Sequence, residues 1–545
     1  MQNPVINHTL PAHPPRHALQ RVARQTTLWA SVGAMLALSA CQTAPARKTE
    51  AVVAQPQIPT TQPYEIHDSE TVSRADEPSV AAQRWQDFYS DARLRRLIEL
   101  GLENNKDINA AVLAIQKSRA QYQITDINDL PTFNGSASAA RTGDFDGTAN
   151  TRYNVGLALA SYEFDFWGRI ASLKEAALQD FLATAAAKDA VQISLISNIA
   201  QSYVAYSYNL AQLELARQTL KTREDSLRIN RKRYEAGLDS QLTTVQAQSL
   251  VESARVSIAN AETNLLKNRN ALRYLIGTPI DNSLLPPPAI NSITNNRVFN
   301  AGLPSDLLLY RPDIRQAEHT LKGAGANIEA ARAAFFPSIG LSGSVGTASL
   351  ELSDLFKSGT FNWGITPTVS LPIFDAGRRR INYELAEITE QQALNNYEKS
   401  IQTAFKEVND VFATRATLKD QLAAYDRMLT ANQKNRQIAD VRFKAGLDNY
   451  LNVLDAQRSI YSTQQSILNT RQAQLVSQIQ LYQVLGGGVN LDIPLDAPSP
   501  RYQNASTVIT NVTRRVMPTH VQNADGDRAI AITNTTTTQT VDNGK

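Results

Sequence analysis

The stretch that decides the fold is Arg-Tyr-Glu-Ala-Gly-Leu-Asp at residues 233–239, which returns as Arg-Phe-Lys-Ala-Gly-Leu-Asp at residues 442–448. The offset of 209 residues also aligns Gly277 with Gly486. A period of this length is that of a duplicated domain, because the repeats of solenoid proteins are about 20–50 residues long. We therefore expect two copies of one large structural unit.

Each copy of this stretch lies between two long spans without Gly or Pro, the residues that most often interrupt helices. The spans predict long helices at 169–236 and 378–445, each followed by a shorter helix, at 240–276 and 449–485. At 1.5 Å per residue the long helices measure about 100 Å. Their Ala, Gln and Leu content suits coiled-coil packing. Further helices, predicted at about 91–128 and 312–334, extend the shorter ones end to end.

Side chains alternate between apolar and small or polar before each long helix. Trp363, Ile365 and Val369 lie on one face of such a segment, and Gly364 and Thr366 lie on the other. Period-2 alternation is typical of an outer-membrane β-barrel, and it also fits a half-buried soluble sheet. The strands are predicted at about 132–142, 152–164, 338–346 and 362–374.

Four strands are too few for a barrel with a lumen, because barrel diameter grows with strand number. Open strand edges cannot lie in lipid. If these strands span a membrane, several chains must share one barrel. The loops at 143–151 and 347–360 then face the outside.

The N-terminus has the pattern of an export signal. Arg16, Arg21 and Arg24 precede a mostly apolar run at residues 28–38. This run is too short for a transmembrane helix, which needs about 20 residues, and it suits a signal peptide. We predict that residues 1–40 are removed.

Leu38-Ser39-Ala40-Cys41 resembles the bacterial lipobox, in which the cysteine is acylated. The alternative is an ordinary cleavage site with an incidental cysteine. Cys41 is the single cysteine of the chain, which excludes a disulfide framework and a cysteine zinc site. Residues 41–84 are predicted to form a lipidated N-terminal tether, and residues 498–545 a disordered polar tail.

Composition and motifs exclude several classes of function. The net charge is +3, and three arginines of the predicted signal account for it, so no basic field indicates nucleic-acid binding. The six histidines are scattered without metal-ligand spacing. The chain has no P-loop, H-E-x-x-H or G-x-S-x-G motif. We therefore expect no enzyme activity, no catalytic residue, no metal, and no cofactor besides the lipid on Cys41.

The duplicated strand pair and long helix, the Gly-Leu-Asp turns and the lipobox together resemble the TolC-type outer-membrane efflux proteins, in their lipoprotein branch. The resemblance covers about residues 85–495, with repeat 1 at 85–285 and repeat 2 at 286–497. It implies a mainly α fold with transmembrane β-strands. Three chains form a homotrimer, in which four strands per chain make one 12-stranded barrel in the outer membrane, continued by a long periplasmic α-helical barrel.

The resemblance also implies a function. Proteins of this family are exit ducts of tripartite efflux systems, alongside a periplasmic adaptor (membrane fusion) protein and an inner-membrane pump. The lipoprotein branch implies an RND-type pump, small toxic compounds or drugs as cargo, and a part in multidrug efflux and antibiotic resistance. One alternative is a duct for ATP-driven polypeptide secretion. Another, from a different class, is a structural coiled-coil spacer of the envelope.

Carried onto this sequence, the resemblance assigns adaptor docking to the two helical turns, at Gly237, Leu238, Gly446 and Leu447. The glycine permits the positive φ angle that a tight turn needs, and the leucine offers an apolar contact. The alternative is that Gly-Leu only caps the helical hairpin.

The same resemblance assigns a periplasmic aperture to residues near the turns. Asp455 matches a position where three chains bring acidic side chains around the pore, which concentrates negative potential and favours cations. An exposed helix face is the alternative. Near this position the chain lacks charged residues that other family members have, so the ion pairs of those members cannot form in the same way. We therefore expect Arg233 and Arg442 to pair instead with carboxylates at their own turns. The aperture set is Asp239, Asp448, Asn452 and Asp455.

Overall fold

The computed structural model describes residues 64, 66, 70–74, 77–143, 147 and 149–488. The predicted signal peptide, the lipidation site Cys41, most of the predicted tether and the polar tail lie outside the described residues.

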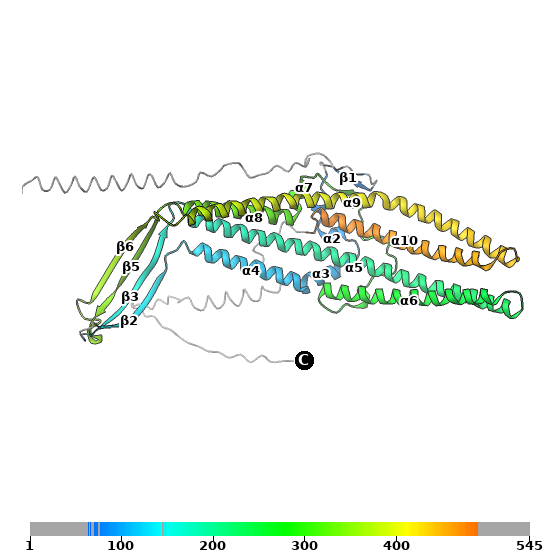
Figure 1. The fold of residues 1–545 in the computed structure, drawn as a ribbon, viewed down its shortest axis with the longest axis horizontal. Helices are drawn as coiled ribbons and strands as arrows, with labels where there is room; N and C mark the ends of the chain where they lie inside the picture. Colours follow the sequence, from blue (N-terminus) through cyan, green and yellow to red (C-terminus); the bar gives the residue numbers. More distant parts are fainter. Residues whose placement is uncertain are drawn as a thin grey trace, which may run out of the picture. The chain divides into compact units, whose positions relative to one another are not determined.

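Four long helices form the body of the described chain. They are α5 (Arg169–Glu235), α6 (Gln241–Ile276), α9 (Arg378–Lys444) and α10 (Tyr450–Val484). Each begins and ends within one residue of the predicted bounds. Figure 1 shows α5 with α6, and α9 with α10, as two antiparallel hairpins that reach their turns at the same end.

The helix predicted at about 91–128 is in fact two helices, so this prediction is wrong. They are α3 (Ala92–Asn104) and α4 (Lys106–Ile127), and Asn105 between them is extended, with ψ of 136°. Asn105 Oδ1 accepts hydrogen bonds from the backbone N–H groups of Asp107 (2.7 Å) and Ile108 (3.2 Å), which caps α4. Its Nδ2 donates to Leu275 O at 2.8 Å. In the second repeat, α8 (Pro312–Ala333) is one continuous helix.

A four-stranded antiparallel sheet precedes the two long helices. Its strands are β2 (Phe133–Gly143), β3 (Ala149–Phe164), β5 (Ser338–Ser349) and β6 (Phe361–Ser370), in the order β2-β3-β5-β6. The pairing of β3 with β5 joins the two repeats, and it leaves β2 and β6 as edges within the described chain.

Strand β6 ends at Ser370, four residues before the predicted end at residue 374. Pro372 lies in the excess segment and has no N–H group to donate to a strand ladder. Pro367 lies within β6, opposite Leu341 of β5, in a strand that is an edge of the single chain.

A connecting layer packs around the middle of the long helices. Strand β1 (Thr71–Val72) pairs in parallel with β4 (Phe299–Asn300), and Val80 and Ala81 are buried. The prediction of a tether through residue 84 is therefore wrong for residues 70–74 and 77–84. The remaining short elements are η1 (Val80–Ala82), α2 (Trp85–Phe88), η2 (Asn282–Leu284), α7 (Asp306–Tyr310) and η3 (Leu352–Asp354).

The main hydrophobic core lies where this layer meets the middle of α5 and α9 and the C-terminal end of α10. Phe88 stacks on Tyr482 with ring centroids 4.0 Å apart, and Ile199 and Tyr203 of α5 are fully buried. This core joins the two repeats. None of the helices in the described residues is long and apolar enough to cross a membrane.

Candidate functional site: two helical turns and an open-edged sheet

The first helical turn follows α5. Gly237 has a φ angle of +71°, and its N–H donates to Tyr234 O at 2.9 Å. The N–H of Leu238 donates to Arg233 O at 2.8 Å. These two bonds form a Schellman motif, which ends a helix through a left-handed residue. The left-handed backbone conformation therefore explains why residue 237 is a glycine.

The second turn repeats this arrangement after α9. Gly446 has a φ angle of +74°, and the N–H of Leu447 donates to Arg442 O at 2.9 Å. Leu447 is 67% exposed and Leu238 is 69% exposed. A leucine that stapled the turn would be covered by the helix end. Both leucines are instead available to a partner.

The charged residues at each turn form an ion pair within their own hairpin. Arg233 Nε lies 3.5 Å from Asp239 Oδ2, and Asp239 Oδ1 accepts a hydrogen bond from Thr243 Oγ1 at 2.8 Å. Arg442 Nε lies 2.5 Å from Asp448 Oδ2. The Arg442 guanidinium holds the pKa of Asp448 below its usual range. The carboxylates next to both turns are therefore already engaged.

Asn452 and Asp455 lie within the first two turns of α10, on its exposed face. The side chain of Asp455 is 60% exposed, and its nearest cation is Arg458, 3.3 Å away on the same helix face. Exposed pairs of this type are weak. Asp455 therefore remains able to act on its surroundings through its charge.

Aromatic and cation–π contacts link the two hairpins near their tips. The Arg233 guanidinium lies 4.9 Å from the centroid of the Phe443 ring, and Phe443 lies 5.1 Å from Tyr450. Around them is an inter-hairpin cluster of buried side chains, comprising Ala247, Leu250, Ala439, Tyr450, Val453 and Leu454. Sequence reasoning missed this contact. Its available signal was the pair of aromatic residues that flank Gly446 at positions 443 and 450.

The sheet has one apolar face that is exposed on the single chain. Cross-strand pairing aligns Leu157 with Val345 and Val345 with Trp363, and all three side chains are exposed. The next row on this face contains Ile365, which is also exposed. The opposite face carries small and polar residues such as Ser344. Such a face suits lipid on one side and water on the other.

The junction between sheet and helices is fastened by Trp167. Its Nε1 donates to Pro337 O at 2.7 Å, and its ring stacks on Phe336 with centroids 4.8 Å apart. Both partners belong to the second repeat. Trp167 thus ties the start of α5 to the start of β5.

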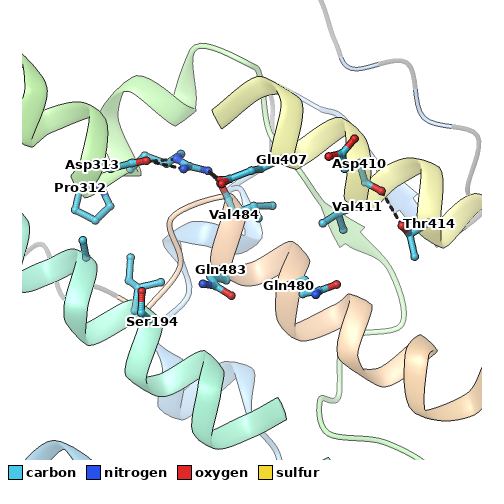
Figure 2. Close-up of a pocket in the computed structure, with 13 residues that line it drawn as sticks. Ser194, Pro312, Asp313, Glu407, Asp410, Val411, Thr414, Gln480, Gln483 and Val484 are labelled. Atoms are coloured by element: carbon cyan, nitrogen blue, oxygen red, sulfur yellow. Dashed lines mark hydrogen bonds and ion pairs between the residues drawn. The ribbon is translucent and has the colours of Figure 1, made fainter. Parts of the chain in front are cut away.

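A cavity of about 550 Å³ lies between α5, α9, α10 and the start of α8, and Figure 2 shows its charged rim. Arg311 is almost fully buried, and it pairs with Asp313 (2.6 Å) and Glu407 (2.8 Å). Its Nη1 also donates to Val484 O at 3.0 Å. The arginine is fully neutralised, so this network fastens α8 to α9 and α10.

A metal site was not predicted. The described residues contain no group of three or more His, Cys, Asp or Glu side chains placed to hold a metal ion.

Comparison with known proteins gives one matching segment in each of the two repeats. The model of the outer membrane efflux protein family matches residues 97–278 and 303–487. The cation efflux system protein CusC of Escherichia coli K12 is 41% identical over 456 residues, which cover 83% of this chain and 97% of CusC. The solvent efflux pump outer membrane protein SrpC of Pseudomonas putida is 40% identical over 464 residues, covering 84% of this chain and 97% of SrpC.

A solved structure supports the same relationship. The open state of the MtrE outer membrane channel of Neisseria gonorrhoeae superposes with a TM-score of 0.71 at 37% identity, covering 80% of this chain and 98% of MtrE. The residues that match the family model include the two turns, the long helices and the sheet. The chain therefore belongs to the outer membrane efflux protein family, with a TolC-like fold and a location in the outer membrane.

Proposed function

We propose that this protein is the exit duct of a tripartite pump that passes small toxic compounds to the outside. The observation that carries the proposal is the open-edged sheet, which presents large apolar side chains and adjoins two helices of 67 residues each. The related proteins CusC and SrpC are named for cation and solvent efflux, respectively. Both names describe small cargo, which favours this function over polypeptide secretion.

The duct is a homotrimer in this proposal. Edge strands β2 and β6 pair between neighbouring chains, since unpaired edges are not tolerated in lipid. Three chains then supply 12 strands, and the lumen continues between the long helices. Acylation of Cys41, which lies outside the described residues, adds a lipid anchor in the outer membrane.

The adaptor docks at the two turns. Leu238 and Leu447 are the exposed apolar side chains that follow each turn glycine, and both hairpins end at the same end of the described chain (Figure 1). Apolar knobs at the tips of helical hairpins suit a partner with a complementary groove. The aperture lies close by, where Asp455 of each chain supplies one carboxylate.

Site-specific photo-crosslinking in living cells tests this function. A photoreactive residue is placed at Leu238 or at Leu447, and Leu266 serves as the control because it is 61% exposed and lies away from the turns. We expect the two turn positions, and not the control, to capture a periplasmic adaptor of a proton-driven pump. Capture of an adaptor from an ATP-driven secretion system would assign polypeptide cargo instead. Capture of nothing but the chain itself contradicts docking at the turns.

A further inference from the structure

Arg223 of α5 is a buried cation without a counter-charge. Its residue is 5% exposed, and no acidic side chain of the described residues lies within ion-pair distance of it. Its Nη1 donates to Leu250 O at 2.9 Å, and its guanidinium lies 5.5 Å from the centroid of the Tyr461 ring. Its Nε is buried without a hydrogen-bond partner. An unpaired buried charge is unfavourable.

A cavity of about 370 Å³ opens beside this guanidinium, between α5, α9 and α10. Polar side chains dominate its lining, among them Gln433, Gln437 and Gln457. Gln457 Oε1 is a second buried atom without a partner, while its Nε2 donates to Ser226 Oγ at 3.4 Å. The two ends of an amide are interchangeable by rotation, so Gln457 can donate into the cavity instead.

The charges around the cavity are unbalanced toward positive. Arg436 also lines it. Asp440 is the acidic residue of the lining, and it pairs with Arg436 at 3.9 Å rather than with Arg223. Burial lowers the pKa of Arg223, Tyr461 opposes this shift, and the charge of Arg458 adds to it. The surroundings thus lack the negative charge that would stabilise this guanidinium.

The second repeat shows that the fold does not need a cation here. The offset of 209 residues places Asn432 at the position equivalent to Arg223. Asn432 Nδ2 donates to Thr463 Oγ1 at 3.1 Å, a neutral contact inside its own hairpin. Packing of a long helix against its shorter partner is therefore satisfied by a neutral side chain. The arginine of the first repeat calls for a separate explanation.

We propose that this cavity binds a dissolved oxyanion of the phosphate or sulfate class. Arg223 supplies a charged donor fork, Arg436 a second charge, and the glutamine amides the remaining donors. The cavity is large enough for such an ion with accompanying water. The bound ion bridges α5 of the first hairpin to α9 and α10 of the second, and so strengthens the packing between the hairpins. This inference is independent of the duct function.

Thermal unfolding of the full-length protein, purified in detergent, tests the site. The probe is inorganic phosphate, compared with chloride at equal ionic strength. We expect a saturable rise of the unfolding temperature with phosphate, lost in Arg223→Gln. Arg223→Lys keeps the charge without the fork, and should need about tenfold more phosphate, equivalent to one lost charge-assisted hydrogen bond.

Arg228→Gln is the matched control. It removes the same charge from an exposed arginine of α5 that does not line the cavity, and the phosphate response should persist. In phosphate-free buffer Arg223→Gln should unfold at a higher temperature than the wild type, because an uncompensated buried charge is gone. An absent phosphate response in the wild type, or an equal response in Arg223→Gln, overturns the proposal.

Two further measurements do not depend on Arg223 variants. Asp440→Asn removes the carboxylate that repels the ion, so half-saturation should occur at lower phosphate. Crystals soaked in selenate should show anomalous density beside Arg223. Unchanged half-saturation together with an empty cavity in selenate refutes the site.

Discussion

Gly237 and Gly446 owe their identity to backbone conformation alone. A Cβ atom built on either residue meets no other atom within 4 Å, whereas both have φ angles in the left-handed region. Gly277 also has a positive φ angle, and there a Cβ atom would lie 2.7 Å from Asn104 O. At Gly237 and Gly446 a side chain would therefore cost free energy through backbone conformation alone. At Gly277 it would also cost free energy through steric crowding.

Replacement by alanine should reveal this difference. Gly237→Ala is expected to lower the free energy of unfolding by about 1 kcal/mol, the usual cost of a left-handed L-residue. Gly277→Ala should cost clearly more, since the backbone of Asn104 cannot move aside without disturbing the end of α3. Urea unfolding followed by helical circular dichroism measures both. Equal losses would show that crowding at Gly277 is relieved at no cost.

His319 gives the contact between α8 and α5 a dependence on pH. Its Nδ1 lies 2.7 Å from Gln179 Oε1. Burial, with Lys322 and Arg315 nearby, lowers the pKa of His319 from its ordinary value of 6.5, against the opposing effect of Glu318. The folded protein therefore binds fewer protons at this site than the unfolded chain, and stability falls as the pH drops below about 6.5.

His319→Gln should remove this part of the pH dependence. The wild type is expected to lose more of its unfolding temperature between pH 7.5 and pH 5.5 than the variant does. A glutamine keeps a polar contact with Gln179 without a titrating group. Parallel curves for the two proteins would assign the acid sensitivity to other residues.

At the scale of the element, a helix or strand could be predicted from the sequence where residues within it or at its ends mark its bounds. Helices α5 and α9 were predicted within one residue, because Gly and Pro are absent from their whole length and Gly ends each. The break between α3 and α4 was missed because Asn105, an ordinary helix-cap residue, marks it, while the nearby Gly101 lies inside α3 and does not end it. Strands β1 and β4 have two residues each and pair across more than 220 residues of chain. No local pattern can indicate such a pairing.

Some features of the candidate site could likewise be predicted from local sequence, and others could not. The turn glycines and their leucines came from the duplicated segment itself, because the repeat sets their spacing. The contact of Arg233 with Phe443, and the unpaired state of Arg223, depend on how one hairpin packs on the other. Contacts between distant segments cannot be predicted from the sequence of either segment alone.

The two faces of β6 should respond differently to charge. Ile365 lies on the apolar face and Thr366 on the polar face of the same strand, and both are exposed in the single chain. Ile365→Arg is expected to cost about 2–4 kcal/mol if it faces the middle of the bilayer, while Thr366→Arg is tolerated. The amount of assembled protein in outer-membrane fractions, judged by semi-native electrophoresis, measures this. Equal loss in the two variants contradicts the assignment of the lipid face.

At the scale of the whole molecule, the long helices of the two repeats differ in how much of their surface other helices bury. Helix α5 contacts α3, α4, α6, α8 and α10 and buries far more side chains than α9, which packs mainly on α8 and α10. Long stretches of α9 are therefore free on the single chain. In the proposed trimer these stretches face a neighbouring chain or the lumen.

Ion selectivity of the reconstituted channel tests the proposed aperture. Asp455→Asn should reduce the preference for cations, since three exposed carboxylates are removed from the trimer. Asp239→Asn serves as the control within the predicted aperture set and should have a smaller effect, because that carboxylate is only 13% exposed and is held by Arg233 and Thr243. Reversal potentials in a potassium chloride gradient report the preference. A larger effect in the control would move the aperture to the first turn.

The duplication gives the proposed trimer a pseudo-sixfold plan, with six hairpins around one axis. Once two hairpins share a chain, each can diverge without the other. The equivalent of Asp455 in the first repeat is Gln246, so the ring would carry three carboxylates alternating with three neutral amides. Such a ring carries half the charges of a ring built from six identical hairpins, and no two neighbouring positions are both charged. The duplicated chain can therefore set the fixed charge of the pore independently of the number of hairpins in its wall.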